Sequence, residues 1–237
     1  MTIEFRFDHD RRSRIGLDEA VFCESKTVGQ ISTMIDALKG EVGGLLLTRL
    51  DQSKFDTLFG RYGSQLDFDP LSHTAIFGQP QSPRRAAPVA IVTAGTSDLP
   101  ASREASRTLF FAGQPYREYN DIGVAGLWRL LERVEDIRRS PVVIVAAGMD
   151  AALVSVIGGL VAGAVIALPT SIGYGVARGG ATAMNASLAS CAPGVTVVNI
   201  DNGYGAACAA LRITRLSPRP PARRGRTGRV GKSHGDD

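Results

Sequence analysis

The feature that most constrains this chain is a series of short β-branched runs that each end in small polar residues. Three of them lie close together, at 141–148 (PVVIVAAG), 162–175 (AGAVIALPTSIGYG) and 194–205 (GVTVVNIDNGYG). A short apolar strand that stops at Gly, Ser, Thr, Asp or Asn is typical of a parallel sheet, and open α/β sheets bind ligands at the carboxyl ends of such strands. The stretch from 141 to 205 therefore predicts a doubly wound parallel sheet with a ligand-binding edge.

The alternation of strands and helices extends on both sides of this stretch. A further strand is expected at 89–93 and a closing helix at 205–216, so about five strands alternate with helices. This order favours an αβα sandwich, in which helices cover both faces of the sheet. The amphipathic segment 127–137 is expected to pack on the sheet through four residues: Leu127, Leu130, Leu131 and Val134.

A smaller α+β domain precedes the sandwich. Its expected elements are, in order, a strand and turn at 20–26, a helix at 28–38 capped by Thr27, a strand at 43–50, a helix at 52–63, and a turn with a last strand at 67–77. Residues 78–88 (GQPQSPRRAAP) contain three prolines and no apolar periodicity, which is typical of a linker. We therefore predict a small α+β N-terminal domain with its linker at 1–85, an α/β domain at 86–216 and a disordered basic tail at 217–237.

The net charge of +4 arises at the end of the chain. From Arg212 onward, eight basic and two acidic residues give +6, which leaves −2 for residues 1–211. The body therefore lacks the charge of a nucleic-acid-binding protein, and no specific nucleic-acid partner is expected. The start of the chain is polar and charged, unlike a signal peptide, and the three cysteines lack CxxC or metal-ligand spacing. A reducing cytoplasm is the expected location.

One uncharged segment, 151–169, has 19 residues, close to the length that spans a bilayer. Three glycines and one serine interrupt it, and Gly158 and Gly159 stand where a helix would give way to a strand. A buried helix followed by a buried parallel strand explains the absence of alternation equally well. We expect this second arrangement and no membrane span.

The types of side chain near the expected strand ends narrow the chemistry. The three histidines are His9, His73 and His234, and none falls in the α/β part, which argues against a histidine-dependent hydrolase or metal site there. The remaining candidates are Cys191, four carboxylates (Asp98, Glu104, Asp150 and Asp201), and Thr, Ser, Asn and Tyr side chains. Cys191 follows an Ala-rich helix, where burial as a small apolar residue is the ordinary role and a helix C-terminus does not lower the thiol pKa. A cationic ligand ring beside Cys191 would favour the thiolate.

Several long motifs occur in an order that resembles one known family. They are 7–27 (FDHDRRSRIGLDEAVFCESKT), 66–77 (LDFDPLSHTAIF), 94–105 (AGTSDLPASREA), 142–160 (VVIVAAGMDAALVSVIGGL), 165–175 (VIALPTSIGYG) and 190–207 (SCAPGVTVVNIDNGYGAA). Together they resemble the LarB family, the pyridinium-3,5-biscarboxylic acid mononucleotide synthases of nickel-pincer nucleotide cofactor synthesis. The α/β half is similar to aminoimidazole ribonucleotide carboxylase, which assembles as an octamer. The resemblance covers nearly everything except the tail.

The resemblance implies a specific reaction. Nicotinic acid adenine dinucleotide would be carboxylated at pyridinium C5, with CO2 or bicarbonate as co-substrate and Mg2+ as cofactor, and its phosphoanhydride would be hydrolysed to release AMP. The family's nucleophilic cysteine matches Cys191. Addition of a thiolate at C4 would dearomatise the ring and make C5 nucleophilic, which divides one difficult step into easier ones. A homo-oligomer, an octamer by resemblance, is also implied.

The resemblance also assigns site residues. Asp150 matches the acid/base position, where the family usually has Glu, so its carboxylate reaches less far and needs burial to offset the helix N-terminus. The substrate-binding positions that match are Thr96, Ser97, Asp98, Thr170, Ser171, Gly173, Tyr174, Asp201 and Asn202. Arg11 and Arg14 are candidate cationic partners for the phosphates and the carboxylate.

Two other functions remain open at this point. A purine-pathway carboxylase or mutase of the same fold would use a histidine in its active-site loop, and residues 95–211 contain none. A nucleotide-binding protein of this fold without catalysis is the second alternative, and the substitution at Asp150 is what supports it.

Overall fold

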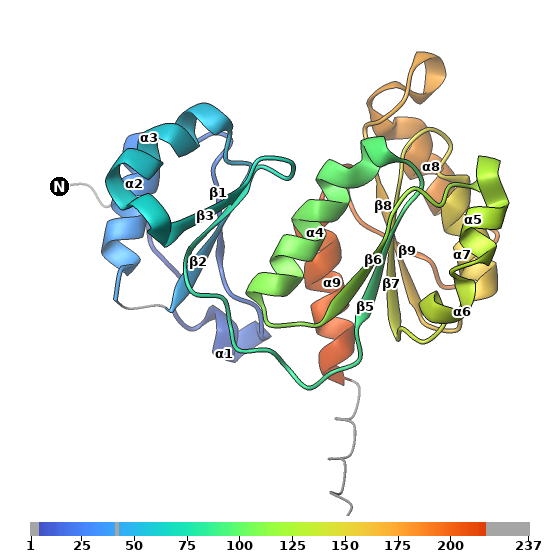
Figure 1. The fold of residues 1–237 in the computed structure, drawn as a ribbon, viewed down its shortest axis with the longest axis horizontal. Helices are drawn as coiled ribbons and strands as arrows, with labels where there is room; N and C mark the ends of the chain where they lie inside the picture. Colours follow the sequence, from blue (N-terminus) through green and yellow to red (C-terminus); the bar gives the residue numbers. More distant parts are fainter. Residues whose placement is uncertain (1–4, 41–42, 217–237) are drawn as a thin grey trace, which may run out of the picture.

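The computed structural model describes residues 5–40 and 43–216, which form two sheets connected by residues 79–88 (Figure 1). The predicted disordered tail lies outside the described residues. In the first unit the strand order is β1-β2-β4-β3, with β1 and β2 parallel and the other pairs antiparallel. Its elements are α1 (Arg11–Ile15), β1 (Ala20–Phe22), α2 (Val28–Leu38), β2 (Gly44–Thr48), α3 (Gln52–Tyr62), β3 (Leu66–Asp69) and β4 (Thr74–Gly78).

Local signals in the sequence account for most of this unit. Thr27 caps α2 as predicted: its hydroxyl accepts from the Gln30 backbone N–H at 3.2 Å, and the Gln30 side chain accepts from the Thr27 N–H at 3.0 Å. Ile31 and Ile35 lie one turn apart on the buried face of the helix. The expected turn and single strand at 67–77 is wrong in detail, because Leu66–Asp69 forms a strand of its own and pairs with β4 as a hairpin.

The second unit is the predicted parallel sandwich. All five strands of its sheet are parallel, in the order β6-β5-β7-β8-β9. Its elements are β5 (Val89–Thr93), η2 (Thr96–Asp98), α4 (Leu99–Phe111), β6 (Tyr116–Tyr119), η3 (Val124–Gly126), α5 (Leu127–Leu131), α6 (Val134–Ile137), β7 (Val142–Ala147), α7 (Ala152–Leu160), β8 (Ala164–Pro169), η4 (Gly175–Gly180), α8 (Ala181–Leu188), β9 (Thr196–Val197) and α9 (Gly203–Leu216).

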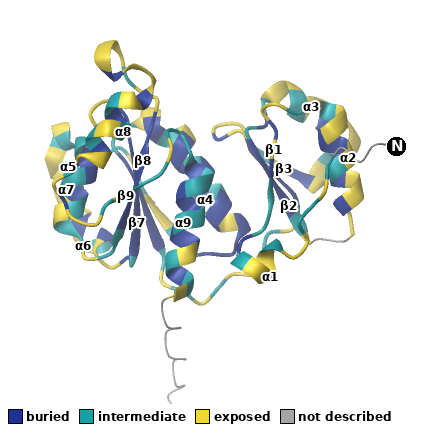
Figure 2. Ribbon diagram, turned by 180° about the vertical axis from the view of Figure 1, so that it is seen from behind, coloured by how far each residue is buried: buried dark blue, intermediate teal, exposed yellow. Residues whose placement is uncertain are grey.

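Helices cover both faces of this sheet. Along β7, Val142 and Ile144 pack with α4 and α9, while Val143 and Val145 pack with α5, α6, α7 and α8. Because both faces are covered, the strand reads as a continuous apolar run and is buried throughout (Figure 2). The predicted fold class is therefore confirmed.

Two predictions about the helices had different outcomes. The segment 127–137 does not form one helix, because the chain turns between α5 and α6; Leu130 and Val134 are buried, but Leu127 and Leu131 are exposed, which corrects the predicted core face. The uncharged segment 151–169 forms α7 and then β8, as predicted. Across the described residues, no helix combines the length and apolar character that crossing a membrane would take.

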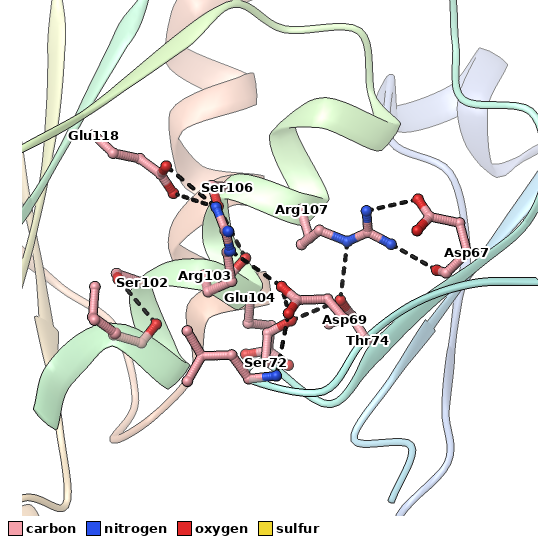
Figure 3. A network of polar contacts seen from close by, with 12 residues as sticks. Asp67, Asp69, Ser72, Thr74, Ser102, Arg103, Glu104, Ser106, Arg107 and Glu118 are labelled. Atoms are coloured by element: carbon pink, nitrogen blue, oxygen red, sulfur yellow. Dashed lines mark hydrogen bonds and ion pairs between the residues drawn. The ribbon is translucent and has the colours of Figure 1, made fainter. Parts of the chain in front are cut away.

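The small unit packs against the face of the sandwich that α4 and α9 form (Figure 1). Leu46 of β2 and Ile76 of β4 bury against Phe111 of α4. Around this apolar contact, the Arg107 guanidinium donates to the Asp67 carboxylate at 2.8 Å, and Arg103 Nε lies 3.2 Å from the Asp69 carboxylate (Figure 3). The small sheet is thereby held beside the carboxyl edge of the large sheet.

Candidate active site

Asp98 connects the ends of three strands at the carboxyl edge. Its Oδ2 accepts from the Gly95 N–H at 2.8 Å, and its Oδ1 accepts from the Gly148 N–H at 3.0 Å and from the Thr170 hydroxyl at 2.6 Å. The three donors lie just after the ends of β5, β7 and β8. The side chain is buried, and this burial raises the pKa of Asp98 although the three hydrogen bonds oppose the rise. Asp98 stands at the N-cap position of α4, but its carboxylate makes no capping hydrogen bond to that helix.

Asp201 makes a second connection along the same edge. Its Oδ1 accepts from the Ser171 N–H at 2.8 Å, and its own N–H donates to the Pro169 carbonyl at 2.9 Å. The neighbouring Asn202 accepts from the Gly205 N–H at 2.7 Å and so begins α9. The predicted polar turns after β5, β8 and β9 are thus brought together. Some of the hydrogen bonds made by their side chains hold the turns themselves in place.

A cavity of about 360 Å³ lies where this edge meets the small unit. The α/β unit contributes Ser97, Thr170, Ser171, Ile172 and Asp201, among others. The small unit contributes Arg49, Leu71, Ser72 and His73 from the turns beside β2 and β4. The cavity therefore combines hydroxyl, carboxylate, cationic and apolar groups from both units, as ligand pockets commonly do.

Arg49 is the arginine that lines this cavity. Its Nε lies 3.4 Å from Oε1 of Glu104, and its guanidinium donates to the backbone carbonyl of Asp201. Glu104 is only 3% exposed and also accepts from the Tyr204 N–H at 3.1 Å. Burial raises the pKa of Glu104, and the nearby Arg49 charge opposes that rise. Arg49 thus connects the small unit to α4 and to the turn that precedes α9.

Backbone strain gathers around the same cavity. Arg49, His73 and Asp201 all have φ of 53°, in the left-handed region that non-glycine residues seldom occupy. A hydrogen bond of 2.7 Å from the Leu50 N–H to the His73 carbonyl holds two of these turns together. Strained residues of this kind persist where the surrounding structure determines them and are enriched at functional sites.

Other predicted substrate-binding residues lie outside the cavity lining. Thr96 and Tyr174 are exposed. Tyr174 directly precedes η4 in the connection between β8 and α8, which projects beyond α8 (Figure 1). Gly173 has φ of 158°, and a Cβ there would lie 2.5 Å from the Ala177 carbonyl, so the loop requires glycine. Arg11 and Arg14 belong to α1, where Arg14 donates to the Asp8 carboxylate at 3.1 Å; neither arginine lines the cavity.

Cys191 is exposed and lies three residues beyond the end of α8. Its loop packs on α7: the Ser190 and Ser155 hydroxyls are 2.8 Å apart, and a Cβ at Gly158 would lie 2.6 Å from the Ala192 Cβ. The helix α7 covers the face of the sheet opposite α4, whereas the cavity lies on the α4 side. Within one chain, the predicted nucleophile therefore lies on one face of the sheet and most of the predicted binding turns lie on the other side.

Asp150 stands at the start of α7. Its Oδ1 accepts from the Ala152 N–H at 3.2 Å, and the residues on either side, Met149 and Ala151, have φ of 52° and 49°. The carboxylate is exposed in the single chain, so the burial that a base at this position needs is not supplied by the chain's own residues.

The described residues do not suggest a metal cage. No three side chains of His, Cys, Asp or Glu come together among residues 5–40 and 43–216 in a way that could hold a metal ion. Glu104, the most buried carboxylate of the cavity, is already partnered by Arg49. The Mg2+ implied by the family resemblance stays a prediction, and we assign it no step.

Sequence reasoning missed Arg49 and His73 as site residues. Arg49 is the first charged side chain after the apolar run at 45–47, the same strand-end pattern that identified the turns of the larger unit. Glu104 was one of the candidate carboxylates, but its place in the middle of a helix gave no sign of its pairing with Arg49.

Comparison with known proteins agrees with this two-part architecture. Residues 3–79 match the LarB/PurE-like N-terminal domain, and residues 88–224 match AIR carboxylase. An uncharacterized protein of Methanocaldococcus jannaschii is 33% identical over 218 residues, which cover 89% of this chain and 84% of that protein. These matches indicate a carboxylase-type enzyme of nucleotide chemistry. The chain belongs to the LarB family, and its α/β half is an AIR carboxylase domain.

Proposed function

We propose that this enzyme carboxylates C5 of the pyridinium ring of nicotinic acid adenine dinucleotide and hydrolyses the phosphoanhydride, which gives pyridinium-3,5-biscarboxylic acid mononucleotide and AMP. The observation that carries the proposal is the cavity at the carboxyl edge, because both family-matched units line it. Hydroxyl groups of Ser97 and Ser171 and the guanidinium of Arg49 suit a phosphorylated ligand, and Leu71 and Ile172 offer apolar contact for a base.

Thiol accessibility favours Cys191 as the nucleophile. Burial raises the pKa of Cys23 to about 12, and burial also raises the pKa of Cys208. Cys191 is the exposed cysteine of the three. In the proposed sequence, the Cys191 thiolate adds to C4, the C5 carbon attacks CO2, a base removes the C5 proton, and the C4–S bond breaks to restore the aromatic ring. Asp150 is the proposed base.

Cys191 lies on the other side of the sheet from the cavity, and this is explained if each active site is shared between two copies of the chain. On the Cys191 side of the sandwich, large apolar side chains are exposed on α5, on α8 and in the connection between β8 and α8: Leu127, Trp128, Leu131, Tyr174, Val176 and Leu188. A surface of this kind is expected to be covered by another protein surface. We propose that a neighbouring copy of the chain covers this surface and buries Asp150. Cys191 of one copy would then lie near the binding turns of the other.

The reaction itself can be tested directly. Purified full-length protein is incubated with nicotinic acid adenine dinucleotide, bicarbonate and Mg2+, and the products are identified by mass spectrometry. The proposal requires a dicarboxylated mononucleotide and AMP. Binding of the dinucleotide without any product would favour the nucleotide-binding alternative, and turnover of aminoimidazole ribonucleotide instead would favour the purine-pathway alternative.

Arg49→Gln is expected to weaken binding of AMP by about 10- to 100-fold, since a charge-assisted hydrogen bond contributes about 1.5–3 kcal/mol. Calorimetric titration with AMP measures this. Arg61→Gln is the matched control, because Arg61 pairs with Asp36 outside the cavity lining. Unchanged AMP affinity in a folded Arg49→Gln variant would show that this cavity is not the substrate site. The proposed reaction would still stand or fall by the product assay.

Mixing two inactive variants tests the shared site. Cys191→Ala lacks the nucleophile, and Arg49→Glu places a negative charge in the cavity. If each site takes its cysteine and its cavity from different copies, a randomly reassembled equimolar mixture regains about a quarter of wild-type sites. Activity that stays at the level of the separate variants after verified subunit exchange would place both residues in one chain's site.

A further inference from the structure

A second cavity, remote from the carboxyl edge, is lined by hydrogen-bond donors. It measures about 510 Å³ and is bounded by Arg12 of α1, by Gln81, Ser82 and Arg84 of the connecting segment, and by Arg215 in the last turn of α9. Three guanidinium groups, one amide and one hydroxyl thus converge from three separate parts of the fold. None of the lining residues is acidic.

The positive charge of this cluster is only partly balanced. Asp18 is the nearby carboxylate, 3.9 Å from Arg12 Nε, and it also accepts from the Gln81 amide. Arg84 donates to the neutral Gln114 side chain at 3.2 Å. Arg215 has no hydrogen bond or ion pair with any residue that the structure describes. Among the described residues, Arg12 is thus the one arginine of the three that has a carboxylate within ion-pairing distance.

Arg215 is held in place without a charged partner. Its guanidinium lies against Gly16, where an added Cβ would be 1.8 Å from one of its nitrogens. Burial lowers the pKa of Arg215, and repulsion from Arg84 and Arg12 lowers it further. Compensation of the α9 dipole accounts for a cation in the last turn. It does not account for two further arginines, contributed by other segments, around the same space.

We propose that this cavity binds a small phosphate-bearing anion, which Arg12, Arg84 and Arg215 hold together. Guanidinium groups bind phosphate oxygens through paired N–H donors, and a multiply charged anion would offset the repulsion among the three arginines. The bound anion would join α1, the connecting segment and α9. It would therefore stabilise the packing of the small unit on the sandwich, and this site is independent of the proposed reaction.

The test is thermal unfolding of the full-length protein in inorganic phosphate or pyrophosphate, compared with chloride at equal ionic strength. Site binding is expected to raise Tm by several degrees beyond the chloride value and to saturate with concentration. The double variant Arg84→Gln, Arg215→Gln should lose this difference. Arg139→Gln, an exposed arginine paired with Asp136 in its own helix turn, should retain it.

Two further variants keep the result interpretable. Arg49→Gln should retain the phosphate effect, which separates this cavity from the one at the carboxyl edge. Ser82→Glu places a carboxylate among the three guanidinium groups, so it should raise Tm in chloride and abolish the response to phosphate, even if the double variant folds poorly. Equal Tm values in phosphate and chloride for wild type would overturn the proposal, as would an undiminished phosphate response in a folded double variant or in Ser82→Glu.

Discussion

Replacing Cys191 by alanine is expected to abolish formation of the dicarboxylated mononucleotide, with a loss of about 10³-fold or more, as is usual when a covalent nucleophile is removed. Without a thiolate to add at C4, the C5 carbon of the pyridinium ring never becomes nucleophilic, so CO2 has nothing to react with. The measurement is product formation by mass spectrometry under single-turnover and multiple-turnover conditions.

The fold of this variant should be unaffected, because the Cys191 side chain is exposed. Cys208→Ala serves as the matched control, since the Cys208 thiol is partly buried against the sandwich core and should not take part in chemistry. Unaltered carboxylation in Cys191→Ala would refute the covalent route while leaving the family membership intact. A loss in Cys208→Ala equal to that in Cys191→Ala would point to a structural cause.

Replacing Asp98 by alanine is expected to lower the free energy of unfolding by about 2–5 kcal/mol and to disorganise the carboxyl edge. The change leaves the Gly95 N–H, the Gly148 N–H and the Thr170 hydroxyl without their shared acceptor. Relief of the buried carboxylate's desolvation offsets part of this loss. Chemical denaturation measures the stability, and AMP affinity reports the state of the edge.

The pH dependence of the Asp98→Asn variant separates the charge of Asp98 from its shape. Because burial raises the pKa of Asp98, the folded state keeps this proton at pH values where the unfolded chain has released it. The contribution of Asp98 to the wild-type free energy of unfolding therefore falls as pH rises from about 4, the pKa of Asp in the unfolded chain, to the raised pKa of the folded state. Asparagine lacks this step, so the stability difference between wild type and variant should narrow over that window. A widening difference would mean that the folded pKa of Asp98 is lowered.

Much of the fold follows from local patterns in the sequence. The apolar runs at 89–93 and 142–147 are buried on both faces, and only a covered parallel sheet gives a strand of that composition. The predicted N-cap Thr27 marked the start of α2 correctly. The break between α5 and α6 was missed, because helical spacing persists across 127–137 although the chain turns within it.

The site was predictable only in part, for a geometric reason. Strand ends meet at one edge whatever the connecting helices do, so the turns containing Asp98, Thr170 and Asp201 could be grouped from the sequence. The face of the sheet on which the Cys191 loop lies depends on the packing of α7 and α8, which no strand pattern encodes. Arg49 was missed because its partner, Glu104, is 55 positions away in the chain and belongs to the other unit.

The docking of the small sheet on α4 and α9 has a consequence for how this protein can be dissected. The Phe111 ring is buried against Leu46 and Ile76, and Glu104 forms an ion pair with Arg49 of the small unit. A fragment that begins at residue 86 would expose that aromatic ring to water and leave a carboxylate facing the gap without its arginine. The sandwich is therefore an incomplete folding module when cut at the connecting segment, and engineered forms of this enzyme should keep both parts on one polypeptide.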